Sequence, residues 1–366
     1  MFEQGTIQLA KVAGIPVRLH WSFMFIILWV WFTAWKDGSD LMGTLYRELF
    51  VLVIFLCVIL HEYGHALVAR KFGHKTQDIL LTPIGGIARL ESLSDNPKQE
   101  LLIALAGPMV NVIIAGIIYT VMKLTGKGFN IFLDESNVAQ TFQYSFFPLV
   151  LTSNVMLALF NMIPAFPMDG GRVLRSLLSF KWPRLKATAI AARIGQFIAV
   201  IAFALALYTG QYMLCLISAF VFFNAGSELK QMKWDGELVN KAARDLYQSP
   251  YDRIDALQPM QVTVDLIRRG IEKNYLVFQD DRYIGYLSIE AILLCIKKKL
   301  TDRPVIEFTK IDNTLIDPNE SLKNVSLRMQ TKNAPILPVG WNDHILGSIE
   351  EYQIKKYVEL RLNSEI

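Results

Sequence analysis

Charged side chains are scarce in this chain of 366 residues. Asp, Glu, Lys and Arg together make up 19% of it, whereas apolar residues make up 52%. Soluble domains carry about a quarter charged residues, so this composition argues against a protein that is soluble throughout, and part of the chain is expected to lie in lipid. The formal net charge is only +4. Because the basic residues are spread around apolar segments, we expect no nucleic-acid partner.

Cysteine is equally rare. Cys57, Cys215 and Cys295 lie far apart and form no C-x-x-C pair, so no disulfide framework is expected. The opening residues, MFEQGTIQLAKVAGIPVRLHW, lack the order of charged, apolar and small residues that marks a signal peptide. We therefore expect no cleaved leader.

Long apolar runs are abundant instead. A helix needs about twenty mostly apolar residues to span a bilayer. Six segments are candidates, although asparagines interrupt the fourth and the sixth: Leu19–Trp35, Glu48–Arg70, Gln99–Met122, Ser145–Ile163, Ala187–Tyr208 and Gln211–Leu229. The sequence therefore predicts an α-helical polytopic membrane domain with about six transmembrane helices over residues 1–235.

Lysine and arginine are divided unequally between the two sets of loops. If the N-terminus is cytoplasmic, the outer loops carry only Lys36, Arg47, Lys123 and Lys127, and the inner loops carry many more. Positively charged loops stay in the cytoplasm. We therefore expect a multi-pass protein of the cell membrane, in contact with the lipid bilayer, with cytoplasmic N- and C-termini.

The second apolar segment ends in the stretch CVILHEYGHALVAR, residues 57–70. His61, Glu62 and His65 form an H-E-x-x-H pattern, and positions i and i+4 share one face of a helix, so both imidazoles can bind one metal ion. Such a site suits Zn²⁺, and Glu62 beside it can act as a general base. The alternative is a chance match at a polar helix end. Two histidines and a glutamate in lipid are costly, however, and favour function.

A catalytic zinc ion needs a third protein ligand. Asp169 is the best candidate, because Pro164 and Pro167 break the chain just before it. Broken helices at membrane depth are tolerated where they line a polar cavity. The alternative is that Asp169 only caps the helix that follows.

These motifs resemble those of the site-2 protease family, zinc metalloproteases that cleave within membranes. Besides H-E-x-x-H, residues 161–171 match its N-x-x-P-x-x-P-x-D-G-G element, residues 107–111 match its G-P-x-x-N helix start, and residues 83–91 look like its membrane-associated β segment. The resemblance covers about residues 10–230. It implies that His61, His65 and Asp169 bind zinc and that Glu62 is the base.

The resemblance implies an intramembrane zinc endopeptidase that cleaves a transmembrane segment of a membrane-embedded protein, such as a single-span regulatory protein. A membrane helix hides its peptide bonds in its own hydrogen bonds, so we expect the substrate to unwind and pair with an edge at Leu80–Leu90. Asn161 either donates to the developing oxyanion or forms a bond between helices, and Asn111 is expected to be structural. A regulated transporter or channel and an inactive relative are the alternatives.

After about residue 240 charges become frequent, and an internal repeat appears. Residues 274–288 resemble residues 334–350, and each copy predicts two strands followed by a helix. The repeat resembles a cystathionine-β-synthase-type (CBS) pair, an α/β domain over residues 246–366. The chain thus resembles the six-span branch of the family that carries such a pair.

CBS pairs often bind adenosine nucleotides through a hydroxyl residue and an Asp three positions later. Here copy one has Ser288 and Ala291, and copy two has Glu350 and Gln353. Both aspartates are missing, so nucleotide binding is doubtful. We expect a dimerisation or gating module instead, with a homodimer formed through the pair.

Overall fold

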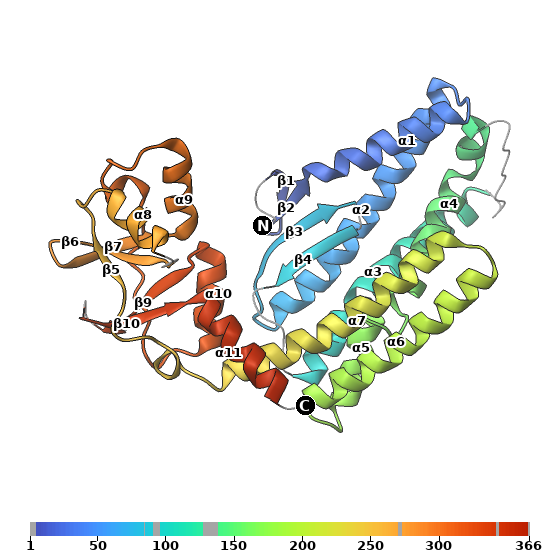
Figure 1. Cartoon of the computed structure of the whole chain (residues 1–366). Helices are drawn as coiled ribbons and strands as arrows, with labels where there is room; N and C mark the ends of the chain where they lie inside the picture. The colour runs from blue at the N-terminus through green and yellow to red at the C-terminus, as the bar shows by residue number, and fades with distance from the viewer. Residues whose placement is uncertain are drawn as a thin grey trace. The chain divides into compact units, whose positions relative to one another are not determined.

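The structure is a computed structural model of the chain, and it describes residues 5–83, 85–90, 96–126, 138–269, 273–341 and 344–364. The chain divides into two compact units, Met1–Leu229 and Lys230–Ile366. The first unit holds long helices and one four-stranded sheet, and the second holds a four-stranded and a two-stranded sheet with short helices (Figure 1).

Helices dominate the first unit. They are α1 (Met24–Lys36), α2 (Leu41–Lys71), α3 (Pro97–Leu124), α4 (Val138–Asn161), α5 (Asp169–Ser179), α6 (Arg184–Tyr208) and α7 (Tyr212–Val239), whose last residues belong to the second unit. Among the described residues, α2, α3, α6 and α7 are long and apolar enough to cross a membrane by length and composition, and the apolar helices Trp21–Lys36 and Ser145–Asn161 are shorter. The structure therefore supports a membrane protein with four candidate spans, and the count of six remains a prediction.

Helix α2 is continuous from the apolar run to the metal-binding motif. It begins after Asp40, whose carboxylate accepts a hydrogen bond from Gly43 N at 2.8 Å. Such a cap satisfies a backbone donor that has no partner within the helix. The helix ends just before Gly73, which adopts a positive φ of 86°. His61 and His65 are therefore held on one rigid element, in its second half.

A four-stranded sheet packs against that half of α2. Its strands, in spatial order, are β1 (Thr6–Val12), β2 (Ile15–His20), β3 (Thr76–Thr82) and β4 (Gly85–Leu90). The β1–β2 and β3–β4 pairs are antiparallel, and β2 pairs with β3 in parallel. Ile15, Val17, Ile79 and Leu81 form a core with Tyr63 of α2. The sheet thus lies directly beside the H-E-x-x-H motif (Figure 1).

Two expectations about this region need correction. Leu19 and His20 belong to β2, because they pair with β1 across a hairpin, so the first apolar helix begins at Trp21 rather than Leu19. The predicted edge at Leu80–Leu90 consists of the end of β3, a turn and β4. Of these two strands, β4 lies at an edge of the sheet and β3 is an inner strand. Ile84 and Glu91 of the predicted β segment lie outside the described residues.

The second unit contains the predicted repeat. Copy one has α8 (Gln261–Arg268), the β6–β7 hairpin (Tyr275–Gln279, Arg282–Leu287) and α9 (Ile289–Lys298), and copy two has α10 (Leu322–Lys332), the β9–β10 hairpin (Ile336–Trp341, His344–Glu350) and α11 (Glu351–Ser364). Short strands β5 (Arg253–Asp255) and β8 (Lys310–Ile311) flank the first hairpin. Leu276 and Phe278 of copy one share a buried core with Val339 and Ile349 of copy two. The copies therefore form one α/β body.

Candidate metal centre

Three buried side chains converge between α2 and the start of α5. Asp169 Oδ2 lies 3.1 Å from His61 Nε2 and 3.1 Å from His65 Nε2, and the two Nε2 atoms are 3.1 Å apart. All three residues are less than a tenth exposed. Their ligand atoms lie within 4.8 Å of one another. The fold thus brings Asp169 to the two histidines although it follows His65 by 104 residues.

Both imidazoles are oriented by acceptors on α3. His65 Nδ1 donates to the carbonyl oxygen of Ile103 at 2.7 Å, and His61 Nδ1 donates to Asn111 Oδ1 at 2.9 Å. In the neutral form of each ring the proton is then on Nδ1, and Nε2 with its lone pair is the nitrogen that faces Asp169. Three electron-rich atoms then face one another, an arrangement that a cation stabilises. Ligands of this kind, with the opposite ring nitrogen held by an acceptor, suit Zn²⁺.

Gly107 allows α3 to run close beside the imidazoles. A Cβ atom on Gly107 would lie 2.2 Å from His65 Nε2 and 2.7 Å from His61 Nε2. Gly64 of α2 has a similar role, since its Cβ would lie 2.7 Å from the carbonyl oxygen of Ala106. Small residues permit such close helix packing in membranes. The G-P-x-x-N pattern places Gly107 and Asn111 one turn apart on α3.

Asn111 forms a hydrogen bond between helices, as expected of a structural residue, and its partner is His61. Its amide group is fully buried and orients His61. The expected helix start at this motif is wrong, because α3 begins at Pro97 and residues 107–111 lie inside it. The sequence indicated no partner for Asn111, because the contact joins positions 50 residues apart.

Glu62 lies beside the three convergent side chains and next to the edge strand β4. Its Oε2 accepts a hydrogen bond from Ala88 N of β4 at 3.1 Å. A Cβ atom on Gly86 would lie 2.8 Å from Glu62 Cγ and 3.2 Å from Val58 Cγ1. The carboxylate of Glu62 is thus in contact with the strand edge, next to both histidines in sequence.

Asp169 is not the capping residue of α5. Met168 occupies the N-cap position, no side chain caps the helix, and the carboxylate of Asp169 faces the histidines instead. Cβ atoms on Gly170 and Gly171 would lie 2.3 Å from the carbonyl oxygen of Ile163 and 2.7 Å from Ala165 C. The two glycines therefore let the preceding turn pack closely against the first turn of α5, and this packing fixes the position of Asp169.

Asn161 is the last residue of α4 and is partly exposed. Its side chain makes no hydrogen bond with the described residues, so the bond between helices that the sequence suggested is not formed there.

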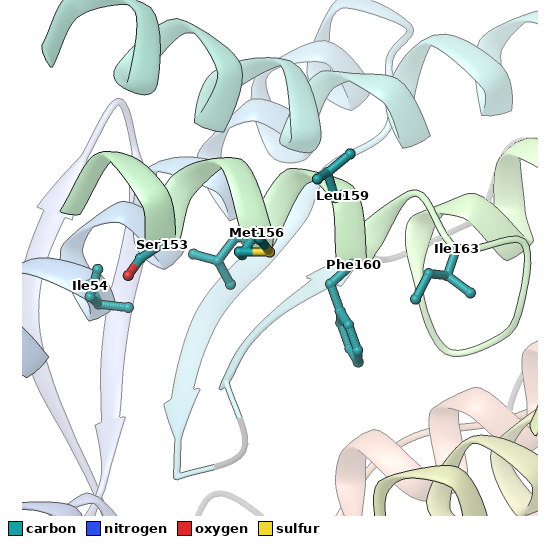
Figure 2. Close-up of a pocket in the computed structure, with 7 residues that line it drawn as sticks. Ile54, Ser153, Met156, Leu159, Phe160 and Ile163 are labelled. Atoms are coloured by element: carbon teal, nitrogen blue, oxygen red, sulfur yellow. The ribbon is translucent and has the colours of Figure 1, made fainter. Parts of the chain in front are cut away.

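An apolar groove of about 620 Å³ lies along α4 and leads toward this end of the helix. Figure 2 shows Ile54 of α2 at one end of the row and Ile163 at the other. The lining residues also include Ser153, Met156, Leu159 and Phe160. Ile54, Val58 and Glu62 recur every four residues, so they share one face of α2. The groove therefore borders the α2 face that carries Glu62.

Comparison with known proteins gives matches over both units. The model of peptidase family M50 matches residues 49–202. A zinc metalloprotease of Methanocaldococcus jannaschii is 34% identical over 333 residues, which cover 88% of this chain and 88% of that protein. The solved site-2 protease of the same organism has 36% identity and a TM-score of 0.44, and covers 61% of this chain and 95% of that chain.

A match also exists for the second unit. The CBS domain of a bacterial CNNM/CorC-family Mg²⁺ transporter, solved in complex with ATP, has 13% identity and a TM-score of 0.32. It covers 36% of this chain and 97% of that chain. The match to family M50 includes His61, Glu62, His65, Asn111 and Asp169.

Proposed function

This chain belongs to peptidase family M50 and is an intramembrane zinc metalloprotease, and on this premise we propose that His61, His65 and Asp169 bind the zinc ion and that Glu62 is the general base. The observation that carries the proposal is the convergence of the three ligand atoms within 4.8 Å. Ile103 and Asn111 support it by fixing both imidazoles with Nε2 toward Asp169.

The residues around the cluster have distinct chemical tasks. Zinc, when bound, supplies a Lewis acid that polarises the scissile carbonyl group and acidifies water. Glu62 takes a proton from the attacking water and passes it to the leaving amine. In the substrate-free protein its Oε2 accepts a hydrogen bond from Ala88 N. The amide of Asn161 donates to the developing oxyanion.

The substrate is a membrane-embedded protein, such as a single-span regulatory protein, whose helix must unwind before it is cut. The unwound segment pairs with the free edge of β4 by strand addition. Ala88 turns its N–H away from β3 and toward Glu62, and Gly86, two residues earlier, faces the same edge. The adjoining apolar groove along α4 can hold the part of the substrate that stays helical.

Six spans with both termini in the cytoplasm complete this proposal. The motif end of α2 then lies on the cytoplasmic side, and its last turn carries Arg70 and Lys71, as expected for an inward-facing helix end. Water reaches the cluster from that side, and the substrate enters from the lipid.

Two alternatives explain the site less well. A transporter or channel regulated by the second unit needs no Glu62 beside a cluster of metal ligands. An inactive relative would not need to retain the base Glu62 together with all three metal ligands, and this chain has all four residues.

Co-expression with candidate single-span membrane proteins tests the function. The wild type is expected to cleave such a protein within its transmembrane segment and to carry about one zinc ion per chain, as a catalytic site requires. Asp169→Ala is expected to bind zinc weakly and to leave the substrate intact. Unchanged zinc content or continued cleavage in that variant would show that the ligands are misassigned.

The strand edge gives a separate prediction. Gly86→Pro removes an N–H donor and fixes φ near −65°, so cleavage of a membrane substrate is expected to fall below detection while zinc is retained. Gly86→Ala is the control, because it adds only a Cβ atom, 2.8 Å from Glu62 Cγ, and should reduce cleavage to an intermediate rate. A proline variant that folds and cleaves normally would indicate docking elsewhere, along the groove of α4.

Residues 246–366 of the second unit are proposed to be a CBS-type pair that forms a homodimer and does not sense nucleotides. The Glu350 carboxylate accepts a hydrogen bond from Asn274 Nδ2 of copy one at 2.8 Å, and burial raises its pKa. Ser288 Oγ already accepts from Ala291 N at 3.3 Å, as the cap of α9. Both places where a ribose would be held are thus engaged within the protein.

Titration calorimetry of the full-length protein with ATP is therefore expected to give no measurable heat at micromolar nucleotide. The double variant Glu350→Ser with Gln353→Asp restores the missing hydroxyl and carboxylate of copy two and is expected to bind more tightly than the wild type. A micromolar dissociation constant for the wild type would restore the role of a nucleotide sensor.

A further inference from the structure

Arg175 is the largest side chain of the structure that is fully buried among the described residues. It lies on α5, six positions after Asp169. Its guanidinium group also stacks on Phe166, 5.0 Å from the ring centroid. Phe166 belongs to the turn that precedes Asp169. A buried charge is retained only where it has partners, so the partners of Arg175 show what it connects.

Those partners lie on two other helices. Arg175 Nε and Nη2 donate to Glu100 Oε1 of α3 at 2.9 and 2.5 Å, and Nη1 donates to Glu228 Oε1 of α7 at 2.6 Å. Arg184 at the start of α6 lies 3.7 Å from Glu100 Oε2. Two arginines thus balance two glutamates. Ser176, the next residue of α5, also donates to the carbonyl oxygen of Pro97 in α3.

Helix α3 is also the element that orients the histidines. Ile103 and Asn111 of α3 accept hydrogen bonds from His65 and His61, and Glu100 lies one turn before Ile103. The two imidazoles and the helix that starts with Asp169 are therefore fixed to the same helix. Arg175 takes part in the attachment of α5 to α3, and it takes no part in the hydrogen bonds of the two imidazoles to α3.

We propose that Arg175 is a positioning residue for the metal site, which holds α5 to α3 and α7 so that the Asp169 carboxylate meets the two Nε2 atoms. This inference rests on the proposed role of Asp169 as a zinc ligand. Arginine is suited to the task because its planar fork donates to two carboxylates in fixed directions and stacks on an aromatic ring. Lysine keeps the charge and loses the fork.

A purely structural role predicts a different outcome from a positioning role. Loss of packing or charge balance alone lowers the melting temperature and leaves the geometry of the bound metal as it was. A shift of α5 moves Asp169 relative to the histidines, and this changes the metal affinity and the visible absorption of Co²⁺ bound in place of zinc.

The test is made on the full-length protein with Arg175→Lys. The zinc dissociation constant, measured by chelator competition, is expected to rise about 10- to 100-fold, as when other residues that orient metal ligands are lost. The Co²⁺ spectrum should shift, and kcat should fall with KM nearly unchanged. Glu228→Gln, which keeps an acceptor and loses one charge, should produce a smaller change in the same direction. Arg193→Lys makes the same substitution at an exposed position and should change nothing.

Wild-type zinc affinity, Co²⁺ spectrum and kcat in Arg175→Lys, with only a lower melting temperature, would overturn the inference. If Arg175→Lys does not fold, Glu228→Gln decides by the same three measurements. The Asp169→Ala variant, in which Arg175 is intact, tests the proposed ligands separately. If Asp169→Ala loses zinc while Arg175→Lys and Glu228→Gln bind it as the wild type does, the positioning role of Arg175 is refuted and the ligand role of Asp169 stands.

Discussion

Replacement of Glu62 by glutamine is expected to abolish cleavage while the protein still binds zinc. Glutamine has the same shape, and its amide oxygen can still accept the hydrogen bond from Ala88 N that Glu62 accepts at 3.1 Å. It cannot take a proton from water. A general base contributes about 10²- to 10⁴-fold to a rate, so the cleavage rate of a reconstituted transmembrane substrate should fall by at least the lower of these factors.

Glu48→Gln provides the matched control, because Glu48 lies on the same helix and its carboxylate makes no hydrogen bond in the described part of the chain. It should cleave at the wild-type rate. Metal analysis of both variants should give the wild-type zinc content. Undiminished cleavage by Glu62→Gln would assign the base to another residue.

Gly107→Ala is expected to remove both the metal and the activity. The new Cβ atom would lie 2.2 Å from His65 Nε2 and 2.7 Å from His61 Nε2, distances at which no two such atoms coexist. Either the imidazoles turn away or α3 moves from α2, and in both cases the ligand atoms separate. We expect zinc content near zero after dialysis and no detectable cleavage.

Gly116→Ala on the same helix isolates this effect. A Cβ atom at Gly116 meets nothing within 4 Å, and alanine favours the helix over glycine by about 1 kcal/mol. This variant should therefore keep zinc and activity and should melt no earlier than the wild type. A Gly107→Ala protein with normal zinc content would mean that the imidazoles lie elsewhere when the metal is bound.

The sequence was most informative where function depends on spacing along one helix. His61 and His65 share a face because of the helical period, and Asp169 was suggested by the proline-broken segment before it. Gly107, Asn111 and their contacts with the histidines depend on how α3 packs on α2. No local pattern encodes that packing, so these roles required the structure.

At the N-terminal hairpin, the sequence predicted a helix where the structure has a strand. Leu19 looked like the start of an apolar helix because a mostly apolar stretch follows it up to Trp35. In the fold, Leu19 pairs with Leu81 of β3, far along the chain. Pairing between distant strands overrides local composition. The repeat in the second unit was easier to predict, because each copy carries its own strand–turn–strand signal.

The hydrogen bond from Ala88 to Glu62 has a consequence for how the protease behaves at rest. A backbone N–H serves one strong acceptor at a time, and this N–H lies on the edge to which an extended substrate would add. A strand that pairs there must take the donor from Glu62. The proposed strand addition would therefore release the Glu62 carboxylate, which in the empty protein is hydrogen-bonded to Ala88 N.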